Sequence, residues 1–380
     1  MGSRVVLAMS GGVDSSVAAH LLKANGHEVI GLFMRTGAHG DDPARRAKTC
    51  CSAIDAQDAR AVADRLDIPF YALDFEGDFA RIMDQFADEY TAGRTPNPCV
   101  SCNLWLKFGK LWSYGRQVGA DHVATGHYAR IAVGPEGLPR IGRGLDPDKD
   151  QSYVLSGLRR ELLPHVLLPI GEFRKAEVRA MARELGLPVH DKAESQEICF
   201  IPDDDYARFV RDRRPGRDAA GPIVDGRGAV LGAHSGIENF TIGQRKGLGL
   251  AVGEPRYVVR IEPATKTVTI GPRAALDRAG LEASRFNWQA GPPPGPLRCL
   301  AQIRARHRAV AATAEALPGG RARVIFDVAQ PAVSPGQVVT LYEGDLVLGG
   351  GWIDAAIDAV TEAELPPRRP TTALGEVSPW

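Results

Sequence analysis

The chain has 380 residues and a formal net charge of zero, because 46 Lys and Arg residues balance 46 Asp and Glu residues. This length, with 44% hydrophobic residues, is enough for about two to three domains with buried cores. A neutral total argues against indiscriminate nucleic-acid binding, yet it permits local basic surfaces that dock one defined RNA. The sequence has no apolar stretch of about 18 residues and no signal-peptide pattern, so we expect a cytoplasmic protein without membrane contact.

A strand, a glycine-rich loop and a helix follow one another at the start of the chain. The short apolar run Val5–Met9 indicates a strand buried on both faces, and apolar positions 17, 18, 21 and 22 share one face of the next helix. A second apolar run, Val29–Met34, completes a unit whose two strands should be parallel neighbours. The loop between the first strand and the helix should therefore lie at the carboxyl edge of a sheet.

That loop, Ser10–Ser15, reads Ser-Gly-Gly-Val-Asp-Ser and has the features of a pyrophosphate-binding loop. Its two glycines let backbone N–H groups turn inward, and the following helix points its positive end at the same place. Neither the lysine-containing NTPase loop nor a dinucleotide-binding motif is present here. Asp14 is suited to hold Mg²⁺ on a pyrophosphate, with Ser10 and Ser15 as extra donors. The pattern predicts splitting of ATP to AMP and pyrophosphate, and the alternative is an ordinary glycine-rich turn.

The α/β pattern continues to about residue 212, where a first domain of residues 1–212 should end. Further strands are expected at 70–73 and 122–125, and a closing helix runs from Lys175 to Leu185. Gly126 follows one of these strands at the carboxyl edge, where open α/β sheets bind ligands.

The composition then shifts to short apolar runs separated by glycines. This predicts a small central domain of antiparallel strands over 213–278 and a β-barrel over 279–365, with Trp352 in its core. Residues 366–380 contain prolines and few apolar side chains, so we expect a mobile tail. Within a strand expected near 300–309, Arg304, Arg306 and Arg308 would share one face, either a phosphate track or a solvated surface.

Six unevenly spaced cysteines do not have the pattern of a disulfide framework, so we expect nucleophiles, sulfur carriers or metal ligands. A turn-rich segment over 95–103 contains Cys99 and Cys102 and leads into a helix expected to begin near Leu104. This would place Cys102 at a helix N-terminus, a position that stabilises a thiolate. Cys99 and Cys102 could form half of a zinc site, but no second such pair exists. Considered without the other motifs, Cys199 could be an unreactive residue that packs in a core as a small hydrophobic side chain.

Several motifs in a fixed order then point to one family. They are Ser10–Ser15, Cys50-Cys51-Ser52 with Asp55 and Asp58, Asn97-Pro98 with Cys102-Asn103, Ala124–Ala129, Asp148–Tyr153, Ser195–Phe200 and Gly236–Gly247. Over residues 4 to about 355 the chain resembles the bacterial tRNA-specific 2-thiouridylases of the PP-loop ATP pyrophosphatase superfamily. The resemblance implies an α/β fold with an N-terminal parallel-sheet PP-loop domain, a small mostly-β central domain and a C-terminal β-barrel that binds tRNA.

The resemblance also implies a reaction. ATP would adenylate the C2 oxygen of the wobble uridine in tRNAs for Lys, Glu and Gln, and sulfur from a protein persulfide would then displace AMP. Cys199 would carry the persulfide and Cys102 would release sulfur to the base, by forming a Cys102–Cys199 disulfide. A cysteine desulfurase or a sulfur relay protein would supply the sulfur.

The implied binding residues fall into three groups. The ATP group, with Mg²⁺ on Asp14, is Ala8, Met9, Ser10, Gly11, Gly12, Val13, Asp14, Ser15, Met34 and Gly126. Asn97, Pro98 and Cys99 would lie beside the target base. The expected tRNA contacts are His127, Lys149, Asp150, Gln151, Arg306, His307 and Gln337.

Two positions depart from the family pattern. Cys99 stands where many members have Asp, so a general acid or base is either replaced by a thiol or absent. Cys99, Cys102 and Cys199 could instead hold a four-iron cluster with one open iron that binds sulfide. His307 stands where the family usually has tyrosine. Two other functions stay open: a PP-loop synthetase that uses ammonia, and an RNA-binding module that keeps ATP as a structural ligand.

Overall fold

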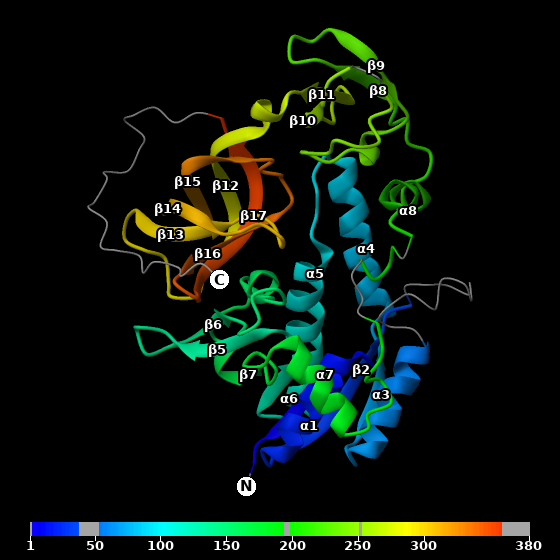
Figure 1. Cartoon of the computed structure of the whole chain (residues 1–380), viewed down its shortest axis with the longest axis vertical. Coiled ribbons are helices and arrows are strands. Elements are labelled where there is room, and N and C mark those ends of the chain that lie inside the picture. Colours follow the sequence, from blue (N-terminus) through cyan, green and yellow to red (C-terminus); the bar gives the residue numbers. More distant parts are fainter. Residues whose placement is uncertain (1, 38–52, 194–197, 202, 251–252, 359–380) are drawn as a thin grey trace. The chain divides into compact units, whose positions relative to one another are not determined.

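A computed structural model describes residues 2–37, 53–193, 198–201, 203–250 and 253–358 (Figure 1). Cys50, Cys51, residues 195–197 and the tail 366–380 lie outside the described residues. The chain divides into two compact units, of which the first comprises Met1–Phe86 and Pro98–Phe209, and the second Ala87–Asn97 and Val210–Trp380.

The first unit is built on a parallel sheet with the strand order β3-β2-β1-β4-β7. Its strands are β1 (Arg4–Ala8), β2 (Glu28–Arg35), β3 (Phe70–Asp74), β4 (His122–Thr125) and β7 (Val166–Leu167). In β1, Leu7 pairs with Gly31 on one side and Ala124 on the other. The predicted fold class is confirmed, and β1 lies centrally with β2 and β4 as its neighbours. A hairpin of β5 (Ala129–Val133) and β6 (Pro139–Arg143) follows β4.

Helices bury the sheet because their apolar faces pack on it. The core joins Val5 and Leu7 of β1 to Val17 of α1, Val62 of α3 and Val178 of α7, all of them buried. The helices that lie wholly in this unit are α1 (Val13–Ala24), α3 (Ala53–Arg65), α5 (Pro98–Ser101), the π-helix η1 (Cys102–Lys110), α6 (Leu111–Gln117) and α7 (Lys175–Glu184). Two more, α4 (Glu76–Thr91) and α8 (Tyr206–Arg213), have residues in both units. Short 3₁₀ turns η2 (Ser152–Leu155) and η3 (Leu163–His165) complete this unit.

The second unit begins with a four-stranded sheet in the order β10-β11-β8-β9. The strands are β8 (Gly221–Val224), β9 (Val230–His234), β10 (Tyr257–Glu262) and β11 (Thr267–Gly271). The expectation of antiparallel pairing is wrong at one place, because Val268 of β11 pairs in parallel with Ile223 of β8. The sheet consists of two antiparallel hairpins, and the join between them is parallel.

A six-stranded antiparallel barrel follows (yellow to red in Figure 1). Its strands are β12 (Asp277–Trp288), β13 (Leu297–Gln302), β14 (Val310–Leu317), β15 (Arg321–Pro331), β16 (Val338–Glu343) and β17 (Leu346–Ile357). They run in the order β12-β15-β14-β13-β16-β17, and pairing of β12 with β17 closes the barrel. Trp352 is 8% exposed, as expected for the core, and burial raises the pKa of the Cys299 thiol to about 12.

The expected strand through Arg304, Arg306 and Arg308 is wrong. β13 ends at Gln302, and the backbone N–H of His307 donates to the Arg304 carbonyl oxygen at 3.0 Å, which makes a turn. The residues that alternate with these arginines are Ala305 and His307, which offer little apolar surface to bury, so strand pairing here would gain little. Arg306 and Arg308 are exposed in this turn and do not form one face of a strand.

Candidate ATP and thiol site

The PP-loop, Ser10–Ser15, connects β1 to α1 at the carboxyl edge of the parallel sheet, as predicted. Gly11 has a φ of +71°, and a Cβ there would lie 2.2 Å from the carbonyl oxygen of Asp55, so only glycine fits. Gly12 is the N-cap residue of α1 with a φ of −100°, and a Cβ there would meet just the Ser10 hydroxyl, at 3.5 Å, among the described residues. Space for a ligand therefore remains beside Gly12.

Serine hydroxyls hold the loop in this shape. The Ser15 hydroxyl donates to the Gly12 carbonyl oxygen at 3.2 Å and accepts from the Ser10 N–H at 3.2 Å. Ser16 donates to the same Gly12 oxygen at 2.8 Å. Ser15 is buried whereas Ser10 is exposed. Ser10 is thus the more accessible of the two expected phosphate donors, and Ser15 has a clear role in the loop itself.

The two residues expected to contact the adenosine both lie at the carboxyl edge of the parallel sheet. Met34 lies near the end of β2 and is 9% exposed. Gly126 follows β4, where a Cβ would lie 2.8 Å from the Ser15 nitrogen and 2.9 Å from the Asp14 carbonyl carbon. Gly126 therefore lets the end of β4 approach the PP-loop backbone. Ala8, Met9 and Val13 complete the loop from the β1 and α1 sides.

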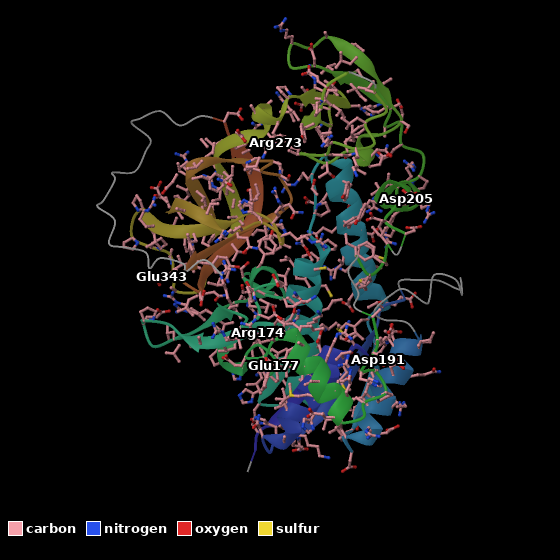
Figure 2. All side chains as sticks on the ribbon, viewed as in Figure 1. Arg174, Glu177, Asp191, Asp205, Arg273 and Glu343 are labelled. Carbon is pink, nitrogen blue, oxygen red and sulfur yellow. The ribbon has the colours of Figure 1, made fainter. Side chains whose placement is uncertain are left out.

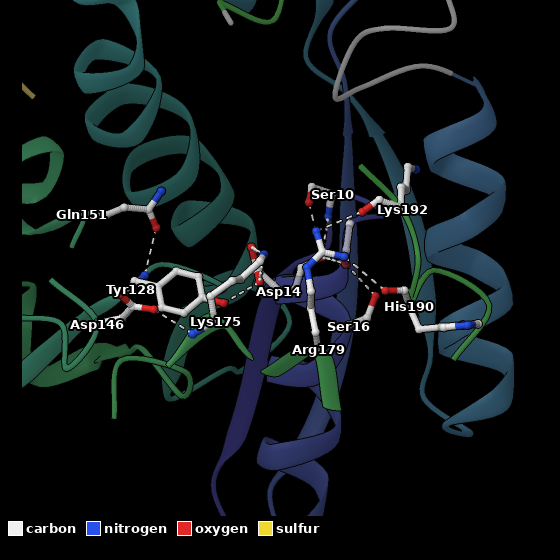
Figure 3. Close-up of polar contacts among 12 residues, drawn as sticks. Ser10, Asp14, Ser16, Tyr128, Asp146, Gln151, Lys175, Arg179, His190 and Lys192 are labelled. Atoms are coloured by element: carbon white, nitrogen blue, oxygen red, sulfur yellow. Dashed lines mark hydrogen bonds and ion pairs between the residues drawn. The ribbon is translucent and has the colours of Figure 1, made fainter. Parts of the chain in front are cut away.

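Asp14 is paired with a lysine that sequence analysis did not single out. The Lys175 ammonium donates to Asp14 Oδ1 at 2.8 Å and to Oδ2 at 2.9 Å, and the Tyr128 hydroxyl donates to Oδ1 at 2.7 Å (Figure 3). Lys175 is the first residue of α7, and its backbone N–H donates to Asp146 at 2.8 Å. The Glu177 carboxylate accepts from the Arg174 N–H at 2.6 Å and caps this helix start. Figure 2 labels both residues at the start of α7.

This arrangement supplies, from α7, the lysine that the loop itself lacks. The Lys175 side chain is 11% exposed and its cation also lies 5.6 Å from the centre of the Tyr128 ring. A buried ammonium beside a phosphate-binding loop can neutralise negative charge on a pyrophosphate. The pattern around Lys175 predicts the helix start but not the partner of the lysine, which is 161 positions away.

The residues present also fit Mg²⁺. Asp14 is 32% exposed, and its Oδ2 accepts only from Lys175 among the described residues. A carboxylate oxygen has two acceptor positions, so Oδ2 retains one for a cation. Asp14 is thus the residue that would hold Mg²⁺ on the phosphates of ATP.

The segment with Cys99 and Cys102 is helical earlier than expected. A helix begins at Pro98 as α5 and continues from Cys102 as the π-helix η1. The expectation that Cys102 lies at a helix N-terminus is wrong, and Cys99 is the thiol in the first turn. Proline is favoured at the first position of a helix because its missing N–H needs no partner there, so Pro98 was the available signal.

Helix α4 contacts both thiol-bearing segments. Its Gln85 accepts a hydrogen bond from the Ser101 hydroxyl, next to Cys102, at 3.1 Å. Its Phe86 ring lies 5.3 Å from the ring of Phe200, next to Cys199, in an edge-on contact. Phe200 also contacts Phe79 of the same helix, at 5.7 Å. The two segments, far apart in sequence, are therefore placed by one helix.

The thiols differ in exposure, since Cys99 is exposed whereas Cys102 and Cys199 are half-buried. Within the described ranges no group of three or more His, Cys, Asp or Glu side chains is arranged to hold a metal ion. Cys99, Cys102 and Cys199 thus do not meet as a ligand set in this structure, and the iron–sulfur cluster stays an untested prediction.

The expected tRNA contacts of the first unit are largely engaged within the protein. His127 is 6% exposed, and its Nδ1 lies 2.7 Å from the Thr125 hydroxyl. Asp150 binds Arg143 at 2.8 Å, and Gln151 accepts from the Tyr128 N–H at 2.9 Å. Lys149 is half-buried in the same loop. These side chains shape the loop beside Tyr128, and their contact with tRNA stays a prediction.

The expected tRNA contacts in the second unit differ in their exposure and in their partners within the protein. Arg306 is exposed, and His307 lies 3.2 Å from the Gln330 side chain. The Gln337 amide donates to the Thr95 carbonyl oxygen at 2.9 Å, two residues before Asn97. Arg94 binds Glu89 at 2.6 Å and Asp354 at 3.6 Å in the same segment. Gln337 therefore holds the segment that leads to Asn97 and Pro98.

We expect the protein to lose stability as the pH falls below about 6.5, the ordinary pKa of histidine. Burial, and to a lesser extent Lys107, lowers the pKa of His127 well below that value. Below about pH 6.5 the unfolded chain therefore binds a proton at His127 that the folded chain does not bind. The free energy of unfolding has its full value above this pH and declines below it. Thermal melts at about pH 7.5 and 5.5 measure the decline. His127→Phe keeps a ring beside Phe108 and should show a smaller decline in melting temperature. An equal decline would contradict the assignment to His127.

The parallel sheet, the PP-loop at its carboxyl edge and the Asp14–Lys175 pair define an ATP-binding protein of the PP-loop class. Three family matches cover most of the chain: "tRNA methyl transferase HUP domain" over residues 3–203, "tRNA methyl transferase PRC-barrel domain" over 207–272 and "Aminomethyltransferase beta-barrel domain" over 278–353.

Comparison with curated relatives identifies the family within this class. The tRNA-specific 2-thiouridylase MnmA of Geotalea uraniireducens is 49% identical over 362 residues, which cover 94% of this chain and 96% of the relative. The MnmA of Rhodopirellula baltica is 48% identical, and the match covers 96% of this chain and 100% of the relative. The MnmA of Clostridium perfringens is 46% identical, and the match covers 93% of this chain and 99% of the relative. The chain belongs to the tRNA-specific 2-thiouridylase family, which confirms the predicted resemblance. In the described part of the chain, no helix is long and apolar enough to cross a membrane.

Proposed function

We propose that the chain catalyses ATP-dependent thiolation of the wobble uridine of tRNA, giving 2-thiouridine, AMP and pyrophosphate. The curated relatives are named tRNA-specific 2-thiouridylases, which supports thiolation of a tRNA uridine. Two of the matching family descriptions name methyl transfer instead. The PP-loop favours thiolation, because splitting ATP turns a poor leaving oxygen into a good one, and methyl transfer needs no such activation.

In the first step the uridine C2 oxygen attacks the α-phosphorus of ATP, a P–O bond forms and the bond to pyrophosphate breaks. The N–H groups of the PP-loop and the start of α1 bind the phosphates. Mg²⁺ on Asp14 would neutralise charge on the departing pyrophosphate. Lys175 adds a second positive charge within 2.9 Å of Asp14. Met34 and Gly126, which lie at the same edge of the sheet as the PP-loop, would contact the adenosine.

In the second step the terminal sulfur of a Cys199 persulfide attacks C2, a C–S bond forms and AMP leaves. The Cys102 thiolate then attacks Cys199 Sγ and breaks the S–S bond to the base. The products are 2-thiouridine and a Cys102–Cys199 disulfide, which a thiol reductant must reduce before the next turnover. Asn97, Pro98 and Cys99 would lie beside the target base.

The observation that carries this assignment is the shared contact of both thiol-bearing segments with α4. Ser101 beside Cys102 and Phe200 beside Cys199 contact the neighbouring residues Gln85 and Phe86. A persulfide mechanism needs two thiols that can meet, and one supporting helix provides a fixed frame for them. A cysteine desulfurase or sulfur relay protein would load Cys199 in the cytoplasm, where tRNA is modified.

The direct test is reconstitution with tRNA, Mg-ATP and a persulfide donor, followed by nucleoside mass spectrometry. Formation of 2-thiouridine with one AMP per product is expected. A synthetase that uses ammonia would form an aminated base instead. A structural ATP-binding module would form neither product, and either result would overturn the proposal.

Cys99 provides a test between the persulfide pair and the iron–sulfur cluster. If Cys102 and Cys199 act as the pair, Cys99→Asp restores the usual acid of the family, so activity should stay within about threefold of wild type or rise. If three thiols bind a cluster, this substitution removes one ligand, and iron and activity should fall together. Anaerobic purification with an iron assay and turnover measurement checks this prediction. About four iron atoms in the wild type, lost with activity in Cys99→Asp, would overturn the persulfide pair.

A further inference from the structure

Lys192 contacts the PP-loop backbone from outside the nucleotide-binding motif. Its ammonium donates to the carbonyl oxygen of Gly11 at 3.0 Å, to Asp55 Oδ1 at 2.6 Å and to Asp58 Oδ2 at 2.6 Å. A lysine ammonium has three N–H donors, and these three acceptors use all of them. The position of the ammonium is therefore fixed from three directions.

The surroundings fix the lysine as well. Asp55 and Asp58 are three positions apart on α3, so their carboxylates face the same side of that helix. Arg179 of α7 donates to the carbonyl oxygens of His190 and Lys192, each at 3.3 Å, and holds the backbone of this segment (Figure 3). Burial lowers the pKa of Lys192, but the two carboxylates more than offset this, and the net shift is upward. The ammonium stays charged at neutral pH.

The contact with Gly11 has a geometric consequence. In a planar trans peptide, the C=O of one residue and the N–H of the next point in opposite directions. Because the Gly11 carbonyl points at the Lys192 ammonium, the Gly12 N–H must point away from it. Gly12 is the N-cap residue of α1, and the residues that the structure describes leave space open beside it. Without Lys192, the Gly11–Gly12 peptide could rotate, since glycine tolerates many backbone conformations.

We propose that Lys192 is a positioning residue that holds the Gly11–Gly12 peptide with its N–H directed at the pyrophosphate of ATP. Asp55 and Asp58 hold the ammonium in place for this purpose. This inference rests on the proposed function, because it assumes that the loop binds ATP. Lys192 acts on the phosphates only through the loop backbone, so it should matter for ligands with a β-phosphate and not for AMP.

The test compares ATP and AMP binding by calorimetry in the full chain with Mg²⁺. Lys192→Met should weaken ATP binding about 10- to 100-fold, the range for a charge-assisted hydrogen bond, and leave AMP binding within about twofold. Lys192→Arg keeps a charged donor and should recover part of the loss. The matched control is Lys23→Met, because Lys23 donates to the carbonyl oxygens of Leu66 and Asp67 near the other end of α1.

The outcomes separate this inference from the proposed function. Equal weakening of ATP and AMP, or no weakening of either, would overturn the role of Lys192. Wild-type protein that binds ATP but forms no 2-thiouridine would overturn the proposed function alone, and wild-type protein that binds no ATP would overturn both. If Lys192→Met does not fold, the same comparison applies to Lys192→Met combined with Asp55→Asn and Asp58→Asn, which leaves no unpaired buried charge.

Discussion

Cys199→Ser is expected to lower 2-thiouridine formation by about 1,000-fold or more, because the residue that carries the sulfur is lost. A serine hydroxyl neither accepts sulfane sulfur nor ionises near neutral pH. The side chain is half-buried and nearly the same size, and the neighbouring Phe200 still packs on Phe79 and Phe86, so the fold should be kept. Nucleoside mass spectrometry of the tRNA after reaction measures the loss.

A matched thiol substitution separates this effect from general damage. Cys299→Ala removes a buried thiol from the barrel, where it contacts the Ala312 carbonyl oxygen. Its turnover per folded molecule should equal that of the wild type, although its melting temperature should fall. The assignment of Cys199 would be wrong if Cys199→Ser kept wild-type thiolation, or if it lost tRNA binding together with activity.

Gly12→Ala and Asp14→Asn are expected to lower pyrophosphate formation by about 100-fold or more, because both change the phosphate-binding loop. The ordinary φ of Gly12 and the open space around it mean that alanine fits the unliganded loop, but its methyl group occupies the place where a ligand would lie. Asp14→Asn removes the negative charge that would hold Mg²⁺ and that pairs with Lys175. Pyrophosphate release in the presence of tRNA measures both effects.

Gly77→Ala is the control for Gly12→Ala. Gly77 lies in α4 and a Cβ there would meet no atom of the described residues within 4 Å, so this variant should be as active and at least as stable as the wild type. Gly12→Ala should melt within a few degrees of the wild type, whereas Asp14→Asn should fold but melt at a lower temperature, because it leaves the buried Lys175 ammonium without a carboxylate partner. Full pyrophosphate formation by a folded Gly12→Ala protein would show that the ligand does not approach this side of the loop.

Local sequence patterns predicted the parts of the site that depend on neighbouring residues. The PP-loop lies where it was predicted because a buried strand, a glycine pair and an amphipathic helix are each recognisable within a few residues. The strand at 122–125 was also found where expected. These features follow from hydrophobic period and backbone freedom, which a single sequence contains.

Contacts between distant segments could not be predicted in this way. Lys175 and Lys192 reach the PP-loop from 161 and 181 positions away, and no local pattern assigns a partner to a lysine. The π-helix after Cys102 also has no signature in composition, because its backbone pattern is set by packing. The turn through His307 departs from the predicted strand for a different reason, because alternation alone does not form a strand when Ala305 and His307 offer so little apolar surface to bury.

Chemical labelling of the Cys299 thiol can report when the strands of the barrel separate. Burial raises the pKa of this thiol to about 12 and leaves the side chain only 1% exposed, so alkylating reagents should reach it only when the strands around it separate. The rate at which Cys299 is alkylated then measures the free energy of that opening under native conditions, much as amide hydrogen exchange does. Ligands that stabilise the barrel should slow this labelling, which allows the stability of this one domain to be followed separately from catalysis.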